Sequence, residues 1–103
     1  MPHPLDEEVR LQVETVRNYL QQYFQHVEDA VEIQGNALED FHAVRVDTGG
    51  NHVVVEVSYG WLRGTPVLQI RMELDALKVV EHLKRPTMAK VRIRPTSLEL
   101  IPG

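Results

Sequence analysis

The chain has 103 residues and a hydrophobic fraction of 43%, which is sufficient for one hydrophobic core, so we expect a single domain over residues 1–103. Its net charge is −4 and it contains no cysteine, which excludes disulfide bonds, thiolate nucleophiles and cysteine-ligated metal centres. No apolar run approaches the roughly 18 residues of a membrane span, and residues 1–10 lack a basic and apolar leader pattern. We therefore expect a soluble, cytoplasmic protein without membrane contact.

The N-terminal third of the chain carries a helical pattern. Residues 1–4 contain two prolines and are expected to form a loose tail, after which Asp6 suits a helix N-cap. Apolar residues then recur at alternating steps of four and three: Val9, Val13, Val16, Leu20, Tyr23, Val27 and Ala30. This spacing predicts a long helix from about Asp6 to Ala30 that packs on a sheet. The pattern leaves the structure of residues 30–40 open.

Two segments with alternating apolar residues flank a pair of glycines. Residues 41–47 and 52–59 lie on either side of Gly49-Gly50, and a Gly-Gly pair favours the tight turn of a β-hairpin. If residues 48 and 51 close the turn, valines of the two strands lie opposite one another on one face. The expected valine pairs are Val46 with Val53 and Val44 with Val55.

The alternation continues beyond the next turn. Leu68, Ile70, Met72 and Leu74 are separated by single polar residues, which predicts a third antiparallel strand over residues 68–74. Trp61 and Leu62 fall in the connecting turn. We expect them either to cover one end of the core or to contact a second subunit.

The C-terminal part predicts a short helix and further strand structure. Asp75 suits the N-cap of a helix over residues 76–84, which Pro86 follows as a breaker. Residues 90–101 alternate again, but the apolar positions change parity at Pro95. This segment is either one bulged strand or a hairpin that pairs Ile93 with Leu98.

Together these elements predict an α+β two-layer sandwich. We expect an antiparallel sheet of three to five strands, with the long N-terminal helix and the short second helix on one face. The expected order is α-β-β-β-α-β, or the same order with one further strand.

The sequence contains no motif for catalysis, cofactor binding or metal binding. Its five histidines fall in separate segments, none forms a paired ligand motif, and His52 is expected to make only a surface pair with Asp47. No glycine-rich phosphate-binding loop or nucleophile elbow is present. We therefore assign no catalytic, cofactor or metal residues, and we do not expect an enzyme.

Charge is distributed unevenly along the chain. Residues 1–40 carry a net charge of −7, residues 41–75 of −1 and residues 76–103 of +4. The basic C-terminal part is the best candidate for binding an anion or nucleic acid. The residues concerned are Lys84, Arg85, Lys90, Arg92 and Arg94.

The leading functional hypothesis is a non-enzymatic, homo-oligomeric protein-interaction module, with or without a further protein partner; nucleic-acid or anion binding is the alternative. A helix from Asp6 to Ala30 spans roughly 37 Å, whereas strands of seven or eight residues span roughly 25 Å. The excess apolar helix surface needs a cover, so we expect a homodimer. The candidate interface residues are Trp61, Leu62, Tyr23 and Val27.

Overall fold

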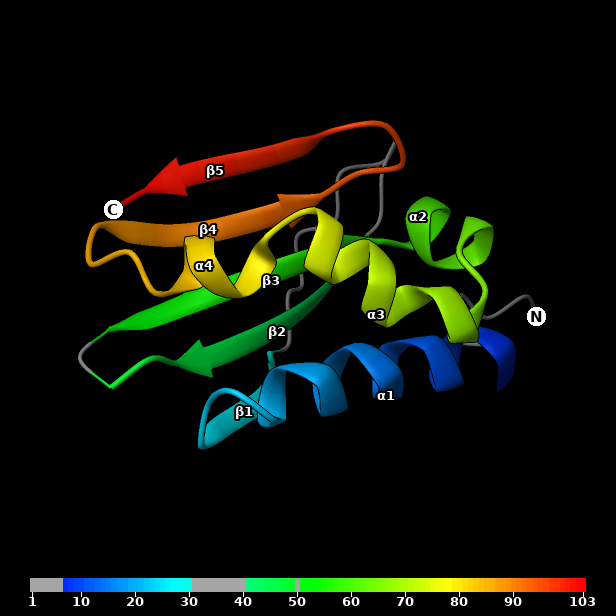
Figure 1. Cartoon of the computed structure of the whole chain (residues 1–103), viewed down its shortest axis with the longest axis horizontal. Coiled ribbons are helices and arrows are strands. Elements are labelled where there is room, and N and C mark those ends of the chain that lie inside the picture. Colours follow the sequence, from blue (N-terminus) through cyan, green and yellow to red (C-terminus); the bar gives the residue numbers. More distant parts are fainter. Residues whose placement is uncertain (1–6, 31–40, 50) are drawn as a thin grey trace.

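The computed structural model describes residues 7–30, 41–49 and 51–103 (Figure 1). Within these ranges the chain forms four helices and a five-stranded sheet, in the order α-β-β-β-α-α-α-β-β. The helices pack on one face of the sheet, which confirms the α+β two-layer architecture with an N-terminal helix. The expected tail at residues 1–4 and most of the open segment, residues 31–40, lie outside the described residues.

The sheet has its strands in sequence order, β1-β2-β3-β4-β5. Neighbouring strands are antiparallel except β3 and β4, which are parallel, so the expected all-antiparallel sheet is wrong at this pair. Three helices connect β3 to β4, and a helical crossover of this kind returns the chain in the same direction. The strands are β1 (His26–Ala30), β2 (Phe41–Asp47), β3 (His52–Ser58), β4 (Met88–Ile93) and β5 (Leu98–Pro102). The helices are α1 (Glu7–Gln21), α2 (Tyr59–Gly64), α3 (Val67–Ala76) and α4 (Val79–Leu83).

The expected register of the first hairpin is confirmed, and the structure decides between the two alternatives left open for residues 90–101. In β2 and β3, Val46 lies opposite Val53 and Val44 opposite Val55. In β4 and β5, Ile93 lies opposite Leu98 and Val91 opposite Leu100, so residues 90–101 form a hairpin rather than one bulged strand. The first hairpin closes with a hydrogen bond of 2.9 Å from the Thr48 N–H to the Asn51 carbonyl, and Gly49 has a φ of 97°, which favours glycine. Gly50 lies outside the described residues.

The first helix is shorter than expected. It ends at Gln21, where the N–H groups of Tyr23 and Phe24 both donate to the Leu20 carbonyl and turn the chain. The chain then forms β1, whose Val27 lies opposite Val46 of β2 and packs against the core. Val27 fits the helical repeat and the strand equally well, which explains the error. The apolar stripe of this shorter helix is buried, because α1 packs against α2 and α3 as well as against β1 and β2 (Figure 1). The length argument for a dimer is therefore wrong.

The expected strand at residues 68–74 is wrong, because this segment is helix α3. Ile70 and Leu74 are fully buried, whereas Leu68 and Met72 are 91% and 69% exposed. Apolar residues at every second position also satisfy the four-residue spacing of a helix face, so Ile70 and Leu74 reach the core together. The polar residues between them are good helix formers, which favours the helix.

The connections on either side of α3 also differ from the expected turn and helix. Residues 59–64 form α2, in which the Ser58 hydroxyl caps the helix by accepting a hydrogen bond of 3.3 Å from the Trp61 N–H. The expected helix over residues 76–84 is the shorter α4, preceded by Lys78 in a left-handed conformation with a φ of 56°. These helices complete the layer that covers the sheet.

The core lies between the helices and one face of the sheet, and the polar side chain of Gln12 reaches into it. The α1 residue Gln12 is fully buried and its Nε2 donates a hydrogen bond of 2.6 Å to the Thr65 carbonyl, between α2 and α3. This contact ties α1 to the start of α3. Val55, Ile70, Val91 and Ile93 are also fully buried.

Candidate functional site

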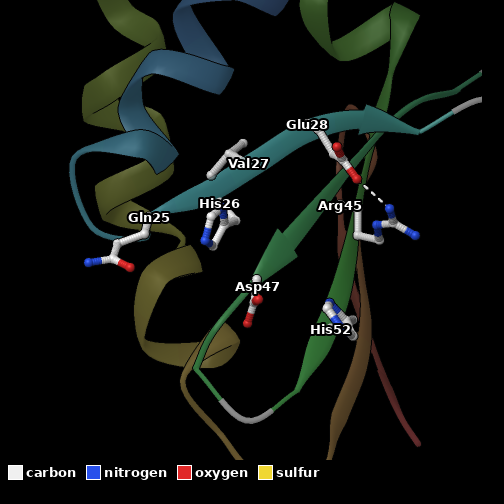
Figure 2. Close-up of a pocket in the computed structure, with 7 residues that line it drawn as sticks. All are labelled: Gln25, His26, Val27, Glu28, Arg45, Asp47 and His52. Carbon is white, nitrogen blue, oxygen red and sulfur yellow. Dashed lines mark hydrogen bonds and ion pairs between the residues drawn. The ribbon is translucent and has the colours of Figure 1, made fainter.

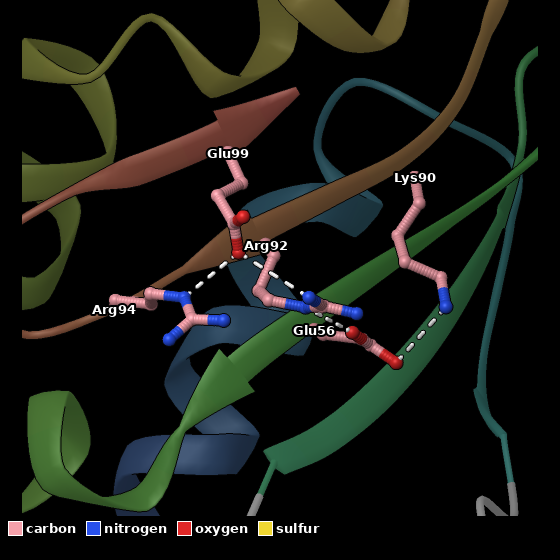
Figure 3. A network of polar contacts seen from close by, with 5 residues as sticks. All are labelled: Glu56, Lys90, Arg92, Arg94 and Glu99. Atoms are coloured by element: carbon pink, nitrogen blue, oxygen red, sulfur yellow. Dashed lines mark hydrogen bonds and ion pairs between the residues drawn. The ribbon is translucent and has the colours of Figure 1, made fainter. Parts of the chain in front are cut away.

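Three of the five basic candidate residues belong to an ionic network on the far face of the sheet, opposite the helices (Figure 3). Arg92 on β4 donates from Nε to Glu56 on β3 at 2.7 Å, and Lys90 Nζ lies 3.3 Å from the other Glu56 oxygen. Arg92 and Arg94 both contact Glu99 on β5, at 3.2 and 2.8 Å. The network therefore joins three neighbouring strands.

Burial makes Glu56 the centre of this network. The residue is 7% exposed, and a carboxylate so far removed from water needs charged partners. Its hydrogen bond raises the pKa of Arg92, against the opposing effect of desolvation. The hydrogen bond from Arg94 is the main cause that holds the pKa of Glu99 below its ordinary value. All these contacts favour the charged forms.

An aromatic ring adds to the same cluster. The guanidinium carbons of Arg92 and Arg94 lie 5.2 and 5.7 Å from the ring centroid of Phe41 on β2, within the range of cation–π attraction. Phe41 and Glu99 were not among the residues expected from the sequence. The alternation of side chains along each strand could have placed Phe41 and Glu99 on this face. It could not have shown that they lie in one cluster, because that depends on how the strands pair.

The fold does not gather all five basic residues. Lys84 and Arg85 follow α4 in the helical layer, whereas Lys90 and Arg92 lie on the far face of the sheet, within the ionic network. An anionic ligand on the far face would have to compete with Glu56 and Glu99 for these bases. The five basic residues therefore do not form one continuous basic surface.

The four candidate interface residues also differ in their exposure to solvent. Trp61 and Leu62 are 5% and 0% exposed, so α2 uses them to cover the core and they are not accessible to a partner. Val27 is partly buried against the core, and Tyr23 is 48% exposed after the end of α1. Of the four, Tyr23 is the most accessible to a second subunit.

Other apolar side chains are more exposed than these. Leu68 and Met72 are 91% and 69% exposed on one side of α3, and Leu11 is 54% exposed on α1, which packs beside α3. We call Leu11, Leu68 and Met72 the outer helix patch. The expected strand at residues 68–74 placed Leu68 and Met72 in the core, so the sequence could not identify this patch.

A second polar site lies at the turn end of β1, β2 and β3 (Figure 2). The register places His26 opposite Asp47, and Asp47 opposite His52, so the three residues form one row across the sheet. With Glu28, Arg45 and their neighbours they line a hollow of about 390 Å³. Glu28 and Arg45 form an ion pair beside the row. His26 was expected in the first helix, so the sequence predicted only the Asp47 and His52 part of this site.

No protein-family model, curated protein or solved structure matches the chain. None of the helices in the described ranges is long and apolar enough to cross a membrane.

Proposed function

We propose that the protein is a non-enzymatic interaction module that forms a homodimer through the outer helix patch. The observation that carries the proposal is the exposure of Leu68 and Met72, at 91% and 69%, one helical turn apart on α3. Single exposed apolar residues are common on protein surfaces, but a pair on one helix, with Leu11 also exposed on the helix packed beside it, supports a contact surface.

Charge around the patch is compatible with a second copy of the chain. Among the described side chains, the exposed ionic residues of α1 and α3 are of both signs: Arg10, Glu14, Arg71, Glu73 and Asp75. Because bases and acids are both present, two copies of this face can place opposite charges against one another. A twofold dimer uses the same surface on both subunits, and a face of mixed sign suits that arrangement.

The size of the patch indicates a weak dimer. Burying three such side chains on each subunit contributes roughly 9–18 kcal/mol, at about 1.5–3 kcal/mol for each fully buried side chain. Association costs about 4–15 kcal/mol in lost freedom of motion. The difference between these ranges extends to about 14 kcal/mol and includes the roughly 8 kcal/mol of a micromolar dissociation constant, so we propose a dimer that dissociates on dilution.

The test of this proposal introduces a charge into the patch. Leu68→Glu should abolish dimer formation, because the carboxylate would be buried opposite apolar side chains. Gln69→Glu adds the same charge one residue away on α3, outside the patch, and serves as the matched control. Light scattering should find the control dimeric and the Leu68 variant monomeric. Equal behaviour of the two variants would contradict the proposal.

The remaining parts of the proposal have independent tests. The cytoplasmic location is checked by cell fractionation. Nucleic-acid binding, the alternative, predicts retention on heparin that falls steeply with added salt. We expect no such retention, because Glu56 and Glu99 already engage Lys90, Arg92 and Arg94.

A further inference from the structure

The row of His26, Asp47 and His52 has the composition of a metal site. Two imidazoles and a carboxylate are a ligand set that suits Zn²⁺, with water in the fourth position. Each residue lies directly opposite the next in the register, so the three belong to adjacent strands. Val27, Val46 and Val53 pack in the core. Since successive side chains alternate between faces, the row projects from the far face.

The side chains of the row make few other polar contacts. Both histidines are exposed, and neither imidazole has a hydrogen-bonding or ionic partner among the described residues. Asp47 accepts a hydrogen bond of 2.9 Å from the Gly49 N–H through Oδ1, which orients the carboxylate. Its Oδ2 has no partner in the described part of the chain. Three ligand atoms are therefore available on one side of the sheet.

The spacing of the strands is compatible with one shared ion. Directly opposite residues of antiparallel strands have Cα atoms about 4.5–5.5 Å apart, so the two histidine Cα atoms lie roughly 10 Å apart with Asp47 between them. Imidazole rings that lean toward the central strand can bridge this span at metal–nitrogen distances of about 2.0–2.1 Å. In the described residues no three such side chains are already gathered around a point, so binding requires the rings to rotate about their side-chain bonds.

The surroundings allow this rotation. The hollow of about 390 Å³ beside the row gives the rings room to move and admits water (Figure 2). Arg45 is the nearest base in the lining, and its ion pair with Glu28 offsets its repulsion of a cation. We propose that His26, Asp47 and His52 form a surface site for Zn²⁺ that links β1, β2 and β3.

The experiment is a titration of the purified full chain with Zn²⁺ against a chelating indicator. We expect one saturable site per chain. His26→Ala and His52→Ala should each lower the affinity by more than about tenfold. His42→Gln is the matched control, because it removes an imidazole from β2 on the opposite face of the sheet and should leave the affinity unchanged.

A second readout separates this site from binding by scattered histidines. An ion that links three strands binds the folded chain, so Zn²⁺ should raise the melting temperature of the native protein and of the His42 variant. It should not raise the melting temperature of the His52 variant. Absence of saturable binding, or equal affinity in the native protein and both alanine variants, would overturn the proposal.

Discussion

Tyr19 illustrates how one polar contact joins two helices. Its hydroxyl donates a hydrogen bond of 2.5 Å to Oδ1 of Asp75 at the end of α3. The centroid of its ring lies 5.4 Å from the ring centroid of Tyr23. Burial raises the pKa of the Tyr19 phenol, and the neighbouring Asp75 carboxylate raises it further. The neutral phenol is therefore the form that stabilises the contact between α1 and α3.

Replacing this tyrosine tests the contact. Tyr19→Phe should lower the free energy of unfolding at pH 7 by about 0.5–1.5 kcal/mol, the usual contribution of one hydrogen bond. Because the folded pKa is raised, the contribution of Tyr19 is fully present below the unfolded pKa of about 10 and is lost as the pH rises above it. Urea unfolding should therefore show a steeper alkaline loss of stability in the native protein than in the variant. Equal slopes would contradict the assigned pKa direction.

At the scale of the element, α3 is the segment where strand and helix give opposite expectations. A strand would bury Ile70 and Met72 on the same face, whereas α3 buries Ile70 completely and leaves Met72 69% exposed. The two residues therefore serve as matched probes of the same change.

An aspartate at each position distinguishes the two conformations. Ile70→Asp should prevent folding, because an unpaired carboxylate in the core costs several kcal/mol out of a total of about 5–15 kcal/mol. Met72→Asp should change the free energy of unfolding by less than about 0.5 kcal/mol when measured in dilute, monomeric protein. Thermal unfolding measures both, and loss of the folded state in the Met72 variant would contradict the exposed position of this residue.

The elements that the sequence predicted correctly are those with a local signal of strand pairing. Gly49-Gly50 and the flanking valines determine the register of β2 and β3, and the change of parity at Pro95 identifies the hairpin of β4 and β5. The errors arose where one pattern satisfies two periods, as at Val27 in β1 and across α3. Tertiary packing decides such segments, and local spacing does not.

The candidate sites depended on those same segments. The outer helix patch exists because α3 is helical, and the row on the far face exists because His26 belongs to a strand. Neither could be identified while those segments were assigned otherwise. The basic strand was predicted correctly as a set of residues on one face, but its carboxylate partner Glu99 depends on the pairing of β4 with β5.

At the scale of the whole molecule, the uneven charge of the sequence is partly neutralised within the chain. The basic C-terminal part pairs with Glu56 and Glu99. At the other edge of the sheet, Asp29 on β1 contacts Arg17 of α1 and His42 of β2. Burial tends to raise the pKa of Asp29, but these two partners outweigh it and the pKa is lowered.

The lowered pKa values of Asp29 and Glu99 predict that the folded state loses stability in acid. A folded pKa below the unfolded value means that the stabilising contribution is present above the unfolded pKa, near 4, and is lost as the pH falls through the lowered folded value. Unfolding free energies measured from neutral pH to below about pH 4 should therefore decline. Glu99→Gln should flatten the acid decline, since it removes one of the two carboxyl groups with a lowered pKa among the described residues. A decline of unchanged steepness in the variant would show that Glu99 does not contribute.

The central claim is that the molecule associates with itself through the outer helix patch. Sedimentation equilibrium of the unaltered chain, over a dilution series of about 1–100 µM, measures this most directly. We expect an apparent mass that rises with concentration from 11.8 kDa toward twice that value. A mass of 11.8 kDa at every concentration would contradict it.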